Sequence, residues 1–244
     1  MKQPGYQKRY YRRWVSADGL LSVRVRVQET DLHILSDLPI NRRYCIERVR
    51  HYRRKIQAYI ARDERFFTSL KPIAIERAAP RIIRDMAAAA RKANVGPMAA
   101  VAGAIAQHLG KDLLKKGCRN IIVENGGDIF VKMSRSVSVG VFAGESVLSG
   151  RMRVLLPLSA RSYGICTSSG TVGHSLSFGT ADAVMIVAGN AALADAVATA
   201  TGNRVKSKED FAAAVRFARS IRGVTGVLVI VKNDFVSWGA LALA

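Results

Sequence analysis

The sequence predicts an α+β fold in which helices pack on a largely antiparallel sheet. Many short apolar runs are joined by hairpin-like connections, whereas a parallel sheet needs a long crossover after each strand. The sequence Asn125-Gly126-Gly127 between two such runs is a strong signal for a tight hairpin turn. The chain has 244 residues, of which 49% are hydrophobic, so it is long enough to bury the core of one compact unit.

The first elements along the chain are two strands and two helices. Residues 21–28 alternate apolar and polar side chains, which is the period of a half-buried strand, and a second strand is expected over residues 31–35. Asn41 is expected to cap a long helix over residues 42–68, whose apolar residues recur at spacings of three and four. Another helix is expected over residues 80–93.

From residue 94 the charge falls and small residues become frequent. A helix over residues 98–116 is expected to end at Gly117, since glycine suits the left-handed conformation that follows a helix. Strands over residues 120–124 and 128–133 flank the glycine turn. Further strands are expected at 137–142, 152–156, 163–167 and 183–188, and helices at 191–201 and 208–221. Ser207 and Asp210 form a variant of the capping box at the start of the second of these helices. A closing hairpin is expected to pair 227–231 with 235–238 around Asn233-Asp234.

The charge of the chain is strongly positive. Its 38 Lys and Arg against 18 Asp and Glu give a formal net charge of +20, and residues 1–92 carry 22 of the basic residues against 9 acidic ones. This charge favours an anionic partner, whether a phosphorylated small molecule, a membrane surface or nucleic acid. A solvated basic helix with no such partner accounts for it equally well.

The cysteines and the hydropathy of the chain exclude several classes of protein. Three widely spaced cysteines disfavour a disulfide framework and a cysteine-rich zinc site, and they indicate reduced thiols. No stretch reaches the roughly 18 apolar residues of a membrane span, and the basic start lacks the apolar core of a signal peptide. We therefore expect a cytoplasmic protein without membrane insertion. The basic strand and helix portion, residues 1–93, is expected to be integrated with the motif-bearing residues 94–244.

Two glycine-containing segments are candidates for ligand binding. Gly96-Pro97-Met98 precedes an alanine-rich helix, and the free N–H groups of a helix start favour an anion such as phosphate. An ordinary helix start with proline in its first turn explains the same residues. In Asn125-Gly126-Gly127-Asp128 the glycines let a ligand approach the backbone, and Asp128 can bond to a ligand hydroxyl. Taken alone, that turn is most often a plain hairpin.

Residues 166–174 follow an apolar strand and concentrate polar side chains. Thr167, Ser168, Ser169 and Gly170 offer hydroxyl groups and a flexible backbone, and His174 can donate to an anion or relay a proton. The loop could wrap a phosphate or a ribose, although it matches no Walker A or GxGxxG motif. A Ser/Gly surface turn is the alternative.

The fourth candidate is an acid and an alcohol on one helix. Asp195 and Thr199 are four residues apart, so their oxygens project side by side, and the alanines around them let another segment approach. A carboxylate and a hydroxyl form a partial shell for Mg²⁺, which completes its coordination with water and phosphate. The alternative is a solvated Asp beside a Thr that bonds back to its own helix.

In this order, and over residues 96–202, the four segments resemble those of the ApbE-type flavin transferases. That family carries a KG-type segment before a helix, a GGD turn, a TSG loop, a histidine loop and an AD..(A)T helix. The matching segments here are Gly96-Pro97-Met98, Asn125–Asp128, Thr167–Gly170, His174, and Asp195 with Thr199. The resemblance covers the C-terminal two-thirds of the chain and implies the α+β fold of the family.

The resemblance also implies a ligand and roles for single residues. FAD would bind near the GGD and TSG segments, Asp195 and Thr199 would hold Mg²⁺ at its pyrophosphate, and FMN would pass to a threonine of a protein acceptor. Catalytic roles would fall to His174 and Asp128. The implied cofactor-binding residues are Gly96, Met98, Asn125, Gly126, Gly127, Asp128, Thr167, Ser168, Ser169 and Gly170. Val95 replaces the family's lysine, and residues 174–179 lack the proline of HI-x-x-P-x-TG, so the chain resembles a divergent branch.

Two other functions stay open. Since the flavin-pocket segment is reduced, the protein could be a module that binds a flavin or nucleotide without turnover. Nucleic-acid binding through the helix at 42–68, with Tyr52 and Tyr59 stacking on bases, ranks third, because both tyrosines share the apolar face and suit the core better. The basic N-terminal portion could also pair two chains into a homo-oligomer.

Overall fold

A computed structural model describes residues 19–157, 159, 161–170, 178–239 and 241–243. Their main feature is an eight-stranded sheet in which every neighbouring pair of strands is antiparallel. Its strands, in spatial order, are β1 (Leu21–Val27), β2 (Thr30–Ser36), β3 (Ile121–Asn125), β4 (Asp128–Lys132), β7 (Tyr163–Ser168), β8 (Ala183–Ala188), β9 (Val224–Val231) and β10 (Asp234–Gly239). A smaller sheet has the order β11-β6-β5 and comprises β5 (Val137–Gly140), β6 (Arg153–Leu156) and β11 (Ala242–Leu243).

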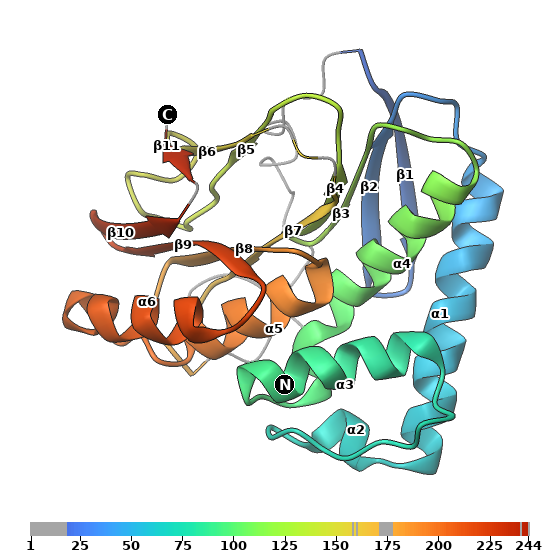
Figure 1. Ribbon diagram of the computed structural model, residues 1–244, viewed down its shortest axis with the longest axis horizontal. Coiled ribbons are helices and arrows are strands. Elements are labelled where there is room, and N and C mark those ends of the chain that lie inside the picture. Colours follow the sequence, from blue (N-terminus) through green and yellow to red (C-terminus); the bar gives the residue numbers. More distant parts are fainter. Residues whose placement is uncertain (1–18, 158, 160, 171–177, 240, 244) are drawn as a thin grey trace.

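Helices cover one face of the large sheet, and the small sheet covers part of the other face (Figure 1). The helical elements are α1 (Arg42–Arg62), α2 (Arg65–Thr68), α3 (Arg81–Ala93), the 3₁₀ turn η2 (Pro97–Ala100), α4 (Val101–Lys115), α5 (Ala191–Gly202), the 3₁₀ turn η3 (Lys208–Asp210) and α6 (Phe211–Ser220). The predicted α+β class, with a mostly antiparallel sheet, is confirmed.

Alternation along the central strands divides the interior into two cores. On β3, Ile121 and Val123 face the helices, whereas Ile122 faces the small sheet. On β4, Phe130 faces the helices, and Ile129 lies on the opposite face. Because both faces of these strands are covered, they are continuously apolar instead of alternating between apolar and polar residues.

The N-terminal strands belong to the same sheet as the motif-bearing strands. In the pairing of β2 with β3, Leu32 lies opposite Asn125 and Ser36 lies opposite Ile121. Strand β1 forms the outer edge next to β2. The chain therefore joins its N-terminal and C-terminal portions through backbone hydrogen bonds of one sheet.

Several boundaries differ from those that the sequence predicts, among them the start of the strand expected at 227–231, which begins at Val224. The helix expected over residues 42–68 ends at Arg62, because Asp63 leaves the helical conformation and accepts a hydrogen bond from the backbone N–H of Arg65, where α2 begins. The helix expected at 98–116 starts with η2, since proline at its first position cannot donate a backbone bond. The last hairpin turns at Lys232 and Asn233, so Asp234 already pairs with Val231 in the strand ladder.

Candidate functional site

The turn between β3 and β4 has the conformation that its glycines predict. Gly126 and Gly127 both have positive φ angles, 69° and 106°, which side chains with a Cβ rarely adopt. The backbone N–H of Gly127 donates to Oε1 of Glu124 at 3.0 Å. Gly126 is exposed, and Asp128, the first residue of β4, is half-buried.

Asn125 connects this turn to the start of α4. Its side chain is buried, and its Nδ2 donates to the backbone oxygen of Ala102 at 3.1 Å. This bond holds the first turn of α4 against the end of β3. The predicted ligand role of Asn125 stays a prediction.

The hydroxyl-rich segment lies beside the glycine turn. Strand β7 pairs with β4 so that Cys166 lies opposite Asp128, which places Thr167 next to the turn. A Cβ atom built on Gly127 would lie 3.7 Å from the backbone oxygen of Thr167. Ser168 and Ser169 follow at the end of β7 and are half-buried like Thr167, whereas Gly170 is exposed.

Helix α5 packs on the helical face of β7 and brings Asp195 to the same place. Its Oδ2 accepts a hydrogen bond from the backbone N–H of Gly103 in α4 at 2.9 Å. The two helices cross so closely that a Cβ on Gly103 would lie 2.3 Å from the backbone oxygen of Ala191 and 2.9 Å from Cβ of Asp195. Thr199 lies one turn further along α5 and, like Asp195, is half-buried.

Two more buried side chains fix the start of α5. Gln107 of α4 accepts a bond from the backbone N–H of Ala191 at 2.9 Å, and Sγ of Cys166 donates to the oxygen of Ala191 at 3.3 Å. Asn190 caps the helix by accepting from the backbone N–H of Leu193. The position of Asp195 is therefore set by contacts with both α4 and β7.

Burial dominates the electrostatics of Asp195 and of the Cys166 thiol. Burial raises the pKa of Asp195 to about 7, against the opposing effect of its bond from Gly103. Burial also raises the pKa of the Cys166 thiol, and the carboxylates of Asp128 and Asp195 raise it further, so this thiol lies near both acids. Among the described residues, no salt bridge joins Asp195 to a basic side chain.

A divalent cation fits this environment. A buried carboxylate without a basic partner is destabilised, and a bound cation would remove that penalty. In the described parts of the chain, no three His, Cys, Asp or Glu side chains gather into a metal-binding group. Mg²⁺ needs few protein oxygens, and Asp195 and Thr199 are the side chains that could supply them here.

The structure places two other predicted residues differently. Gly96 is buried, and a Cβ on it would lie 1.7 Å from the backbone oxygen of Ser69, so close packing against the preceding loop requires this glycine. Met98 in η2 is half-buried. The predicted ligand roles of both residues stay predictions. His174 lies outside the described residues.

Three groups of this site had no role assigned from the sequence, although Cys166 lies in the candidate segment 166–174. These are the backbone groups of Ala102 and Gly103 in α4 and the thiol of Cys166 in β7. The only local signal for the first two was a glycine within an alanine-rich helix, which marks a close helix crossing.

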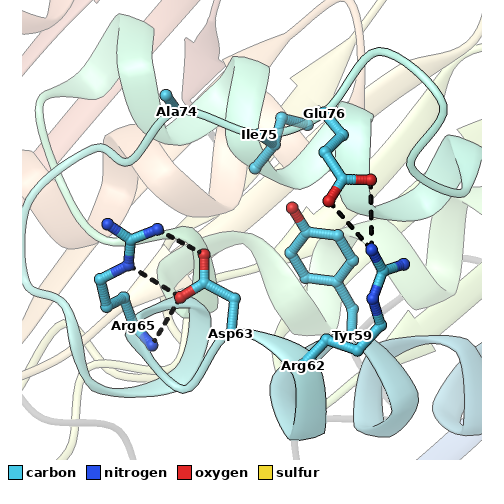
Figure 2. Close-up of a pocket in the computed structure, with 7 residues that line it drawn as sticks. All are labelled: Tyr59, Arg62, Asp63, Arg65, Ala74, Ile75 and Glu76. Atoms are coloured by element: carbon cyan, nitrogen blue, oxygen red, sulfur yellow. Dashed lines mark hydrogen bonds and ion pairs between the residues drawn. The ribbon is translucent and has the colours of Figure 1, made fainter.

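A separate hollow of about 330 Å³ lies where the end of α1 meets the loop before α3. Figure 2 shows two ion pairs, Arg62 with Glu76 and Arg65 with Asp63, beside the ring of Tyr59. The charged groups of this hollow therefore satisfy one another. The Arg62–Glu76 pair joins α1 to the loop before α3, and the Arg65–Asp63 pair stabilises the break between α1 and α2. None of the residues lining the hollow belongs to the motif segments.

The large sheet, its helical layer and the acid-bearing α5 define a protein of the ApbE structural class. The flavin transferase ApbE from Vibrio cholerae matches with a TM-score of 0.59 and 13% identity, over 91% of this chain and 97% of that chain. An ApbE protein from Thermotoga maritima matches with a TM-score of 0.58 and 13% identity, over 89% and 96%. At these identities the likeness establishes the fold.

Sequence comparison places the chain within this class. The family model described as AbpE bacteria matches residues 12–231. UPF0280 proteins of Methanocella arvoryzae and Methanospirillum hungatei are 37% and 43% identical over 90% and 87% of this chain, and over 89% and 85% of their own lengths. The chain belongs to this AbpE bacteria family, as its motifs predicted. No helix in the described residues is long and apolar enough to cross a bilayer.

Proposed function

We propose that this protein binds a flavin dinucleotide of the FAD type together with Mg²⁺, and that it cleaves the dinucleotide or transfers its FMN half. The proposal depends on one observation: Asp195, the glycine turn and the end of β7 lie close together although they are distant in the sequence. The flavin transferases that share this fold lend support to the choice of ligand.

Each segment has a role in this proposal. Asp195 and Thr199 would hold Mg²⁺, which would neutralise the pyrophosphate and the charge on the departing phosphate. The backbone at Gly126 and Gly127 has no side chain to prevent the approach of a ligand, and the hydroxyl groups of Thr167 and Ser168 can donate to phosphate or ribose oxygens.

In the transfer reaction, one P–O bond of the pyrophosphate breaks and AMP leaves. The FMN phosphorus then becomes bonded to a hydroxyl oxygen of a protein acceptor, or of water in the case of simple cleavage. The hydroxyl proton must be accepted, and Asp128 beside the turn is the candidate base within the described chain. His174 is a second candidate, proposed from the sequence alone.

Binding of FAD with and without MgCl₂, measured by isothermal titration calorimetry, tests the ligand and metal assignments. We expect Mg²⁺-dependent binding that is weakened at least tenfold by Asp195→Asn and by Thr199→Val. Thr201→Val is the matched control, because this residue lies on the same helix and its buried hydroxyl has no hydrogen-bond partner in the described structure. Equal binding by parent, Asp195→Asn and Thr199→Val would refute the metal site.

A turnover assay separates an enzyme from a binding module. The protein is incubated with FAD and MgCl₂, AMP is quantified by chromatography, and cell-extract proteins added as acceptors are examined by mass spectrometry for attached FMN. AMP release that Asp195→Asn abolishes would support cleavage or transfer. FAD binding without AMP release would favour the non-catalytic module, and absence of FAD binding would overturn the proposal.

A further inference from the structure

Three helices carry a positive charge that the proposed flavin site does not use. Together α1, α3 and α4 contain 14 Lys and Arg against 3 Asp and Glu. Helices α1 and α3 contact each other, and both contact α4, which packs on β3 and β4 (Figure 1). Their charge is therefore a property of one part of the molecule, although the residues come from separate parts of the sequence.

The two acids at the junction of these helices are already engaged. Asp112 of α4 accepts from Nε of Arg48 at 2.7 Å and from the hydroxyl of Tyr52 at 2.5 Å. Asp85 of α3 is bonded to Nε2 of His108 at 2.9 Å. The rings of Tyr52 and His108 contact each other at 5.1 Å between centroids, which joins α1 to α4.

Five cations around this junction have no such partner among the described residues. They are Arg54 and Lys55 of α1, Arg81 of α3, and Lys111 and Lys115 of α4, which we call the basic face. None of them forms a salt bridge with a described residue.

The cations of the basic face act on one another. Burial lowers the pKa of Lys111, and Arg81 and Lys115 lower it further against the attraction of Asp85. Burial also lowers the pKa of His51, next to Lys55 and Arg54, with these two cations contributing. Positive charges thus gather around Lys111 and around His51, and an external anion would offset them.

The composition of this surface indicates which anion it suits. None of the large exposed apolar side chains among the described residues lies on α1, α3 or α4, so the surface lacks the apolar centre typical of a protein interface. Tyr52 and Tyr59 are buried, so they cannot stack on bases, which corrects the stacking role considered for the helix at 42–68. The surface therefore offers cations rather than apolar or stacking groups. Helix α1, with 21 residues, is about 31 Å long, so these cations can be spread over a long surface.

We propose that the basic face binds the phosphate backbone of duplex nucleic acid without reading its sequence. The cations of three helices offer several simultaneous phosphate contacts, and the binding needs neither base stacking nor an apolar contact. This surface would act independently of the proposed flavin site, from which it differs in residues and in the chemistry of its ligand.

The test measures binding of a fluorescein-labelled, mixed-sequence 20-base-pair DNA duplex by anisotropy over a range of NaCl concentrations. Neutralising three cations, in the variant Arg81→Gln/Lys111→Gln/Lys115→Gln, should weaken binding at least about tenfold at 0.1 M salt. It should also reduce the slope of log K against log salt by about 3, since each lost phosphate contact removes about 0.9.

Control variants separate this surface from the net charge of the protein. Arg151→Gln/Arg161→Gln/Arg216→Gln removes three exposed charges elsewhere and should leave most of the affinity and the slope unchanged. Because Lys111 is half-buried, Arg54→Gln/Lys55→Gln is a second variant on the same face that should reduce the slope by about 2. Circular dichroism verifies that each variant is folded.

Three outcomes would overturn the proposal. These are no binding of the duplex at 0.05 M salt, equal losses in the basic-face and control variants, and preferential binding of polyglutamate or of vesicles containing phosphatidylserine over the duplex. A slope that falls only in the two basic-face variants, with equal affinity for duplexes of different sequence, would support it.

Discussion

Replacing Asp195 by asparagine should stabilise the metal-free protein while weakening its binding of Mg²⁺. Asparagine keeps an oxygen that can accept the bond from the Gly103 N–H, but it carries no charge into the half-buried site. Residues whose buried charge serves a ligand commonly reduce the stability of the empty protein. Under the proposed metal assignment, Asp195 is such a residue.

The pKa of Asp195 gives the size and the pH range of this effect. Its pKa is raised from 3.8 to about 7, and each pKa unit corresponds to about 1.4 kcal/mol. Since the folded-state value lies above the unfolded one, the unfavourable contribution is absent below about pH 4, grows as pH rises toward 7 and is complete above it. The upper bound is about 4 kcal/mol, and we expect about 2 kcal/mol because some water reaches the side chain.

Urea unfolding in EDTA at pH 4.5, 6, 7 and 8 measures this difference. Asp195→Asn should be nearly neutral at pH 4.5 and more stable than the parent at pH 8, and excess MgCl₂ should favour the parent. Asp234→Asn is a control, because this exposed acid forms only a surface ion pair with Lys208 and should change stability little. A destabilised Asp195→Asn protein at pH 8 in EDTA, or a difference independent of pH, would refute the reasoning.

Three further predictions concern the supports of the site. Gly103→Ala should lower the free energy of unfolding by about 1–3 kcal/mol, because the added Cβ would meet the backbone of α5. Gly189→Ala is the control in the same thermal unfolding measurement, because a Cβ at Gly189 would enter open space and should change stability little. Asn125→Ala should lower the free energy of unfolding by about 1–2 kcal/mol, because the hydrogen bond to Ala102 is lost, and it should weaken Mg²⁺ binding. Unchanged Mg²⁺ binding by calorimetry would contradict the positioning role of Asn125. Cys166 should resist a thiol reagent at pH 8 until urea unfolds the protein, because burial and two nearby carboxylates raise its pKa; rapid labelling of the native protein would disprove this.

Local chemistry made much of the fold predictable. The side chain of Asn41 accepts from the N–H of Tyr44 at 3.1 Å, as an N-cap should, and Ser207 and Asp210 form the predicted capping box. The alternation at residues 21–28 and the two glycines of the β3–β4 turn also correspond to what the structure shows. These features depend on residues near one another in the sequence, so one sequence carries the information.

The site could be predicted only in part because its geometry depends on tertiary contacts. Asp195 and Thr199 share a helix face, a relation that the sequence contains. The bond from Gly103 to Asp195 joins residues that are 92 positions apart, and no local pattern indicates that distance. The break after Arg62 was missed for a different reason, since the bond from the Arg65 N–H to Asp63 competes with a helical pattern that continues through it.

The spatial order of the eight strands follows their order along the chain; only β5 and β6, which belong to the small sheet, come between two of them in the sequence. A ribosome therefore releases each strand of the large sheet after the neighbour on which it pairs. No later strand has to enter between two that are already joined, so the nascent chain can extend one growing edge toward β10. Premature pairing of a half-made sheet with another polypeptide is a hazard at that growing edge, and each newly synthesised strand covers it in turn.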